Sequence, residues 1–194
     1  MRGYLKGILA LVSLGSLVSG GWLMAQNAPV KNVVLVHGAF ADGSSWSKVI
    51  PLLQAKGLHV TSVGTPLTSF ADDLAATKRA IAAEDGPVIL VGHSYGGVVI
   101  TEAGNDPKVA GLVYVAAFAP DANQNITEIS KPFPPPPGWF IVASKDNMIA
   151  PEQEKSMAKQ IGAITFVLPS SHVAMLSHPK EVANVIEDAA AGKK

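Results

Sequence analysis

The chain has 194 residues, of which 48% are hydrophobic and 15% charged, and its 15 basic and 15 acidic side chains balance at neutral pH. This length and apolar content suit one globular domain with a substantial core, and the balanced charge gives no electrostatic reason to expect nucleic acid or an anionic membrane as a partner. There is no cysteine, which excludes disulfides, thiolate metal sites and a cysteine nucleophile.

The N-terminal stretch predicts export. Arg2 and Lys6 precede residues 7–25, an uncharged run rich in Leu, Val, Gly and Ser. Such a run after basic residues is typical of a secretory signal peptide, here residues 1–25. The alternative is a membrane anchor, because the run just reaches the length of a bilayer span. We expect a periplasmic or secreted protein whose folded domain covers residues 30–192.

Apolar stretches alternate with helix-forming stretches through the rest of the chain. The predicted strands are residues 31–36, 58–63, 88–91, 111–116, 139–143 and 164–168. The predicted helices run from Ser44 or Ser45 to Gly57, from Ser69 to Ala83, from Gly96 to Asn105, from Pro151 to Gly162 and from Pro179 to Ala190. This alternation predicts a three-layer α/β fold with a mainly parallel sheet of about six strands.

The stretch with the clearest chemical signal follows the third predicted strand. The apolar run 88–91 ends in Gly92-His93-Ser94-Tyr95-Gly96, and a second apolar run follows. The first run predicts a strand buried on both faces, and the second predicts a helix packed on the sheet. A serine on so tight a turn needs small neighbours, because Cβ atoms there would collide. We interpret Ser94 as the nucleophile of a nucleophile elbow.

A serine nucleophile requires a base, and histidine is the usual one. The chain has histidines at His37, His59, His93, His172 and His178. In this fold class the base follows the nucleophile in the sequence, which disfavours the first three. His172 comes just after the last predicted strand, at the sheet edge where such folds bind ligands. His178 precedes Pro179 and is interpreted as a surface or capping residue, so we predict His172 as the base.

Two carboxylates compete to orient that base. Asp146 follows the strand at 139–143, and Asp121 follows the strand before it, so both lie at the expected edge. Asp121 opens the Pro-rich segment 121–138, where geometry would be held loosely. We therefore prefer Asp146, although an acidic residue of a surface loop is the alternative interpretation.

The first predicted strand runs into His37-Gly38-Ala39-Phe40. An oxyanion hole takes one backbone N–H from the loop after that strand and one from the residue after the nucleophile. Ala39 and Tyr95 occupy these positions. As apolar residues of a substrate pocket we name Phe40, Phe118 and Met175.

Taken together, these motifs resemble a known family. The chain is similar to the small α/β-hydrolases of the group that contains plant methylesterases, hydroxynitrile lyases and their bacterial esterase relatives. The resemblance extends from Val33 to about Ile186. It rests on His37-Gly38-Ala39 with Trp46 downstream, Gly92-His93-Ser94-Tyr95-Gly96-Gly97, Asp146 in Lys-Asp-Asn-Met-Ile, and Ser171-His172-Val173-Ala174-Met175-Leu176-Ser177-His178-Pro179. It implies Ser94, Asp146 and His172 as a triad, and Ala39 and Tyr95 at the oxyanion hole.

The resemblance also separates the branches of the group. Its lyases carry Thr where this chain has Gly38, and Lys near the catalytic histidine, where this chain has Val173, Ala174 and Met175. The esterase branch is therefore favoured. Relatives insert a helical cap of several dozen residues before the strand at 139–143, whereas residues 121–138 form only a short Pro-rich replacement.

From the sequence we expect a serine carboxylesterase that acts on a small-molecule ester through an acyl-enzyme, without a cofactor or a metal. One alternative is a triad hydrolase acting on a thioester, a lactone or a C–C bond. The others are an inactive ligand-binding domain or an interaction domain without a cap. Apolar side chains that a cap would otherwise cover are also expected to favour self-association.

Overall fold

The computed structural model describes residues 29–120 and 138–193. The predicted signal peptide and nearly all of the Pro-rich segment, including Asp121, lie outside the described residues. Within the two described ranges, no helix is both long enough and apolar enough to cross a membrane.

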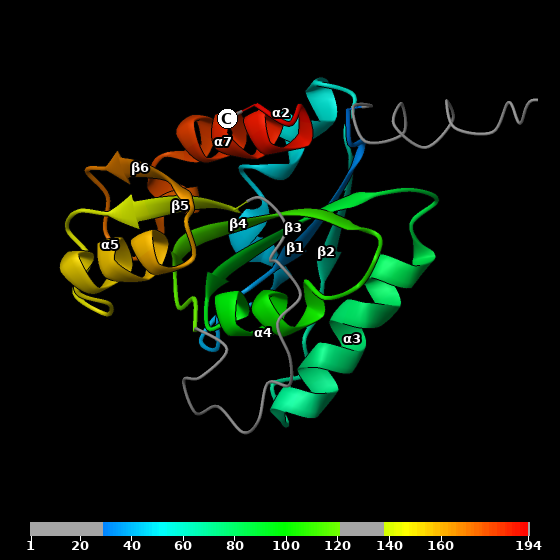
Figure 1. Ribbon diagram of the computed structural model, residues 1–194, viewed down its shortest axis with the longest axis horizontal. Coiled ribbons are helices and arrows are strands. Elements are labelled where there is room, and N and C mark those ends of the chain that lie inside the picture. Colours follow the sequence, from blue (N-terminus) through cyan, green and yellow to red (C-terminus); the bar gives the residue numbers. More distant parts are fainter. Residues whose placement is uncertain (1–28, 121–137, 194) are drawn as a thin grey trace, which may run out of the picture.

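Six parallel strands form one sheet in the order β2-β1-β3-β4-β5-β6 (Figure 1). The strands are β1 (Asn32–Val36), β2 (His59–Val63), β3 (Val88–Ser94), β4 (Val109–Ala117), β5 (Gly138–Ala143) and β6 (Ile164–Leu168). The four inner strands are almost wholly buried, whereas β2 and β6 are partly exposed at the two edges. The predicted α/β fold is confirmed, and every strand pair is parallel.

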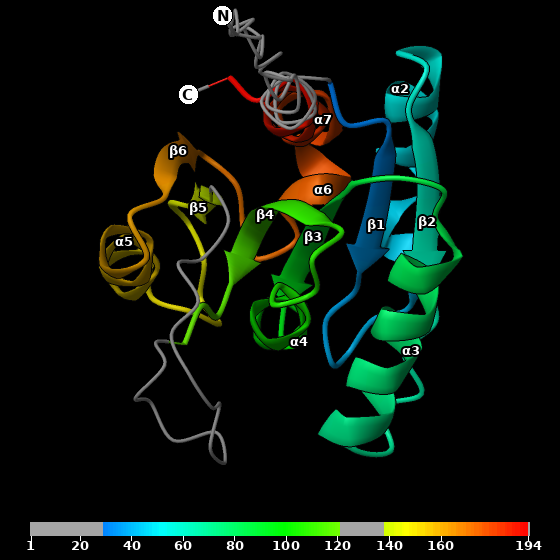
Figure 2. The ribbon, with the colours of Figure 1, turned by 45° about the vertical axis from the view of Figure 1, so that its right-hand side comes forward.

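Helices cover both faces of the sheet, as Figures 1 and 2 show. The helices are α2 (Ile50–Ala55), α3 (Phe70–Ala83), α4 (Gly96–Ala103), α5 (Pro151–Gln160), α6 (Ala174–Ser177) and α7 (Pro179–Ala190), with a 3₁₀ turn η2 at Gly43–Trp46. One core cluster lies between the sheet and η2, α2, α6 and α7. A second lies between the opposite face and α3, α4 and α5. The sheet thus separates two apolar layers and holds its strand ends at fixed positions.

Local sequence signals explain most helix boundaries, with one correction. Ser69 begins α3 as predicted, because its hydroxyl accepts a hydrogen bond of 3.1 Å from the Asp72 N–H. The helix predicted from Ser44 or Ser45 to Gly57 is instead divided into η2 and α2. Pro51 has no N–H to continue the first turn, and the regular helix therefore starts only at Ile50.

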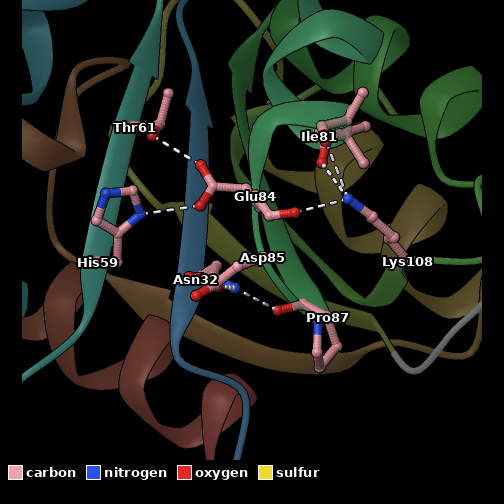
Figure 3. A network of polar contacts seen from close by, with 9 residues as sticks. Asn32, His59, Thr61, Ile81, Glu84, Asp85, Pro87 and Lys108 are labelled. Carbon is pink, nitrogen blue, oxygen red and sulfur yellow. Dashed lines mark hydrogen bonds and ion pairs between the residues drawn. The ribbon is translucent and has the colours of Figure 1, made fainter.

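A polar network holds the amino ends of the strands together (Figure 3). Lys108, just before β4, donates to the carbonyls of Ile81 at 3.4 Å, Ala82 at 3.0 Å and Glu84 at 2.6 Å, where α3 ends. The Glu84 carboxylate accepts hydrogen bonds of 2.8 Å from His59 and Thr61 on β2. The ammonium group therefore caps a helix C-terminus whose carbonyls lack partners within the helix.

Replacing Lys108 by Met should destabilise the fold, because the apolar stem remains while the cap on α3 is lost. We expect the free energy of unfolding to fall by about 1–3 kcal/mol, measured by urea denaturation. Lys155→Met is the matched control, since Lys155 pairs only with the exposed Glu152 at 2.7 Å and such pairs contribute little. An equal effect of both substitutions would contradict this role of Lys108.

Candidate active site

Ser94 ends β3 in a strained backbone conformation. Its φ is 52°, in the left-handed region that residues with a side chain rarely adopt. Such a conformation costs about 1–3 kcal/mol and persists only where the surroundings enforce it. Here the enforcement is close backbone packing: a Cβ at Gly92 would lie 2.6 Å from the Gly96 carbonyl oxygen, and a Cβ at Gly96 would lie 2.6 Å from that of Val36. The predicted strand-to-helix turn and its need for glycine are confirmed.

The loop after β1 reaches the same point. A Cβ added to Gly38 would lie 3.0 Å from the Ser94 Cβ. The buried His37 ring fixes this loop, because its Nδ1–H donates to the Gly38 carbonyl at 2.9 Å while Nε2 accepts from the Thr65 hydroxyl at 2.7 Å. A peptide unit is planar and trans, so the N–H of Ala39 points opposite to the Gly38 carbonyl.

Tyr95, directly after Ser94, is held from the side by α3. Its hydroxyl donates to the Asp73 carboxylate at 2.8 Å, and Asp73 also accepts a hydrogen bond of 2.7 Å from the Leu67 N–H. Burial and the neighbouring carboxylate raise the pKa of the phenol above its ordinary value, so the hydroxyl remains a donor. Sequence reasoning missed Asp73, since nothing in the sequence marks it as facing inward rather than toward solvent.

Asp146 and His172 form a hydrogen-bonded pair at this edge of the sheet. The His172 Nδ1 lies 2.7 Å from the Asp146 Oδ2, and the other carboxylate oxygen accepts from the N–H groups of Met148 at 2.6 Å and Ile149 at 3.1 Å. Burial alone would raise the pKa of this carboxyl, but the hydrogen bonds from His172 and the two amides outweigh it and hold the pKa below 3.8. A buried carboxylate thus fixes the proton of His172 on Nδ1 and leaves Nε2 as the basic nitrogen.

His93 connects the turn at Ser94 to the loop of His172. Its Nε2–H donates to the His172 carbonyl at 2.9 Å, and the two imidazole rings lie 4.8 Å apart. Burial lowers the pKa of His93 to about 4, so the ring is neutral at physiological pH. This contact brings the loop carrying His172 against the turn carrying Ser94. No hydrogen bond from another described residue reaches the Ser94 hydroxyl, and in unliganded enzymes such contacts often tighten only when substrate binds.

The three predicted pocket residues have different environments. Phe40 is 95% exposed and Phe118 is 37% exposed, whereas Met175 is fully buried in the core. Met175 is therefore not available to line an open pocket as predicted, because α6, which was not predicted, turns it toward the sheet. Exposed apolar side chains follow five of the six strands; we call them the apolar rim, and they are Phe40, Leu67, Phe118, Met148 and Val173.

In the part of the chain that the structure describes, no three His, Asp or Glu side chains are grouped as metal ligands. His172 and its partner Asp146 are surrounded by polar groups: the His93 ring lies beside His172, and the amides of Met148 and Ile149 bind the Asp146 carboxylate. Ser94 directly follows His93 in the chain. Such a set suits proton transfer to and from a nucleophile.

Comparison with known proteins identifies the class. The profile described as "Alpha/beta hydrolase family" matches residues 33–130, and the chain belongs to this family. Methylesterase 2 of Arabidopsis thaliana is 30% identical over 136 residues, covering 60% of this chain and 52% of that protein. Salicylic acid-binding protein 2 of Nicotiana tabacum is 37% identical over 111 residues, covering 49% and 42%.

A bacterial protein is similar as well. The carbendazim hydrolyzing esterase of a Nocardioides species is 32% identical over 121 residues, covering 54% of this chain and 49% of that protein. The chain spans about half the length of the curated relatives it matches. The crystal structure of polyneuridine aldehyde esterase aligns with a TM-score of 0.74 at 20% identity, over 82% of this chain and 98% of that one. This structural likeness supports the fold.

Proposed function

We propose that the chain is a serine hydrolase that cleaves carboxylic esters of small molecules. The observation that carries the proposal is the placement of Ser94, at a φ of 52°, beside the loop whose His172 is paired with the buried Asp146. The names of the relatives, methylesterases and a carbendazim hydrolyzing esterase, support this class of substrate.

In the proposed reaction, His172 Nε2 accepts the proton of the Ser94 hydroxyl while Oγ attacks the ester carbonyl carbon. The N–H groups of Ala39 and Tyr95 stabilise the resulting oxyanion. When the intermediate collapses, the alcohol leaves with the proton from His172, and Ser94 carries the acyl group. Water, deprotonated by His172, then attacks the acyl carbonyl and releases the acid.

The oxyanion hole is supported by the way each amide is held. Hydrogen bonding of the Gly38 carbonyl by His37 directs the Ala39 N–H away from it, and Asp73 holds the Tyr95 side chain at the start of α4. The first N–H groups of a helix have no partner within it, so they are available to an anion. Preorganised donors of this kind lower the barrier because they need not reorient during the reaction.

Replacing Ser94 by Ala should reduce ester turnover by about 10⁴–10⁶-fold, because the members of a triad act as a unit. The measurement is the hydrolysis of a chromogenic short-chain ester, together with labelling by a fluorophosphonate probe that reacts only with an activated serine. Ser45→Ala is the matched control, since Ser45 lies at the 3₁₀ turn η2 and bonds only to the Asp42 carbonyl at 2.8 Å. Hydrolysis that survives the Ser94 substitution nearly intact would overturn the proposal.

Asp146, and not Asp121, is proposed to orient the base. Without this carboxylate, the imidazole can adopt the wrong tautomer, which costs on the order of 10⁴ in kcat. Asp146→Asn should therefore lower kcat by orders of magnitude more than Asp121→Asn, both measured with the same ester. A larger loss in the Asp121 variant would reverse the assignment.

The apolar rim leads us to propose an open substrate site that also promotes self-association. Its members are exposed at the ends of different strands, with Phe40 almost entirely in solvent. An open site contacts little of a substrate beyond the reacting group, so less binding energy is available to the transition state. Exposed apolar patches of this kind also promote contacts between copies.

We expect a preference for short activated esters, a high KM for bulky ones, and concentration-dependent association in sedimentation measurements. Phe40→Ser should reduce the association. Val167→Ser is the control, because Val167 is also exposed but lies on β6, outside the rim. A monomer that hydrolyses bulky esters with a low micromolar KM would contradict the open-site proposal.

A further inference from the structure

Glu154 is a buried carboxyl group that the proposed reaction does not use. It lies in the first turn of α5, and its side chain is completely buried. Oε2 accepts a hydrogen bond of 3.1 Å from the N–H of Ala143, the last residue of β5. Oε1 is also buried, yet it has no hydrogen-bond donor among the described residues. An ionised carboxylate in this position would leave one charged oxygen without compensation.

The neighbour of Glu154 is the carboxylate of Asp146, which cannot supply a donor while it is ionised. Both Asp146 oxygens already accept hydrogen bonds, Oδ1 from Met148 and Ile149 and Oδ2 from His172. The Asp146 N–H donates to the Ala143 carbonyl at 3.1 Å, and the Ala143 N–H donates to Glu154, so both acidic residues bond to the last residue of β5. A proton on Glu154 Oε1 would turn this oxygen into a hydrogen-bond donor. It could then donate to the Asp146 carboxylate, so that Oε1 would no longer lack a partner.

Nothing else described around Glu154 compensates a negative charge. α5 packs against β5 and β6, whose sequences contain no titratable side chain. On α5 itself, Lys155 is exposed and paired with Glu152 at 2.7 Å. Lys145, next to Asp146, is exposed to solvent. The charged group that acts on Glu154 is thus Asp146, whose other partner is His172.

We propose that Glu154 is a neutral carboxylic acid that donates a hydrogen bond from Oε1 to Asp146 and so acts as a positioning residue for the Asp146–His172 pair. This inference rests on the proposed function, in which Asp146 orients the base. The N–H of Ala143 and the proton of Glu154 then link the end of β5 to the carboxylate in the loop that follows.

The electrostatic environment agrees with this arrangement. Burial, and then the adjacent Asp146 carboxylate, raise the pKa of Glu154 to about 8, despite the opposing hydrogen bond from Ala143. The two carboxyl groups differ in the number of hydrogen-bond donors that they meet. Asp146 has three donors from other residues and remains ionised, whereas Glu154 has one and retains its proton. Two neighbouring carboxyl groups in a dry site rarely ionise together.

Ionisation of Glu154 should disturb the pair in a defined way. The hydrogen bond to Asp146 is lost, and two buried negative charges then repel each other. Asp146 is displaced from Nδ1 of His172, and the base loses its orientation. Activity should therefore fall as the pH rises through the pKa of Glu154.

The protonation state can be measured without relying on activity. Infrared difference spectra between the wild-type protein and Glu154→Gln should show, at pH 7, the carbonyl band of one protonated carboxylic acid, and this band should vanish as the pH rises through about 8. Glu152→Gln is the matched control, because Glu152 is an exposed glutamate in the same turn and its replacement should leave the band of the protonated acid unchanged. If the spectra show no band of a protonated Glu154 even at pH 6, the proposal is overturned.

The functional consequence is tested by the pH profile of kcat. The wild-type protein should lose activity at alkaline pH, by about threefold or more between pH 7 and pH 9.5, whereas Glu154→Gln should lack this decline because an amide donates without ionising. Glu154→Leu, which cannot donate, should lower kcat at pH 7 about tenfold below that of Glu154→Gln, with little change in KM. Glu152→Gln should keep the wild-type profile.

The outcomes separate the two proposals. An alkaline decline that persists unchanged in Glu154→Gln, in a protein that Ser94→Ala inactivates, would refute the role of Glu154 and leave the proposed function in place. If the wild-type protein hydrolyses no ester, the proposed function fails, and the role of Glu154 in positioning a catalytic pair fails with it. The infrared titration would then still decide whether the acid is neutral.

Discussion

The structure depends on the close approach of backbone segments where β3 turns into α4. Gly92, Gly96 and Val36 leave no room for a Cβ at the glycine positions, so the turn can pack only with these small residues. The same packing keeps Ser94 in the left-handed region and aligns the start of α4 with the loop after β1. β1 lies directly beside β3 in the sheet, and this pairing brings the loop after β1 to the turn.

Much of this could be predicted from the sequence because the signals are local. Uninterrupted apolar runs indicate strands buried on both faces, and Ser69 marks the start of α3 through hydrogen bonds within a few residues. The stretch around Ser94 combines three such signals, which are the apolar run before it, the glycines on both sides of it and the apolar run after it. His172 and Asp146 could also be predicted, since the carboxyl ends of parallel strands meet at one edge. Their hydrogen bond joins two loops that are adjacent only because β5 and β6 pair.

What could not be predicted depends on the direction of side chains after packing. His93 donates to a carbonyl 79 positions away, and Tyr95 donates to Asp73, which resembles any other acidic residue of an amphipathic helix. Glu154 is a sharper case, because a glutamate between Gln153 and Lys155 in a polar helix suggests solvent exposure. Only the packing of α5 against β5 shows that it is buried. The division of the first helix by Pro51 was likewise missed, since proline is also common at the start of an uninterrupted helix.

The polar network around Lys108 and Glu84 has a consequence for how this protein can change over time. It joins the amino ends of the strands, whereas Ser94 is the last residue of β3 and Asp146 and His172 lie beyond the carboxyl ends of β5 and β6. Insertions and substitutions in the loops around Ser94 therefore leave the contacts of this network untouched. Residues in these loops can therefore change during evolution while the amino-end network keeps the fold stable. The two ends of the sheet can thus evolve independently of each other.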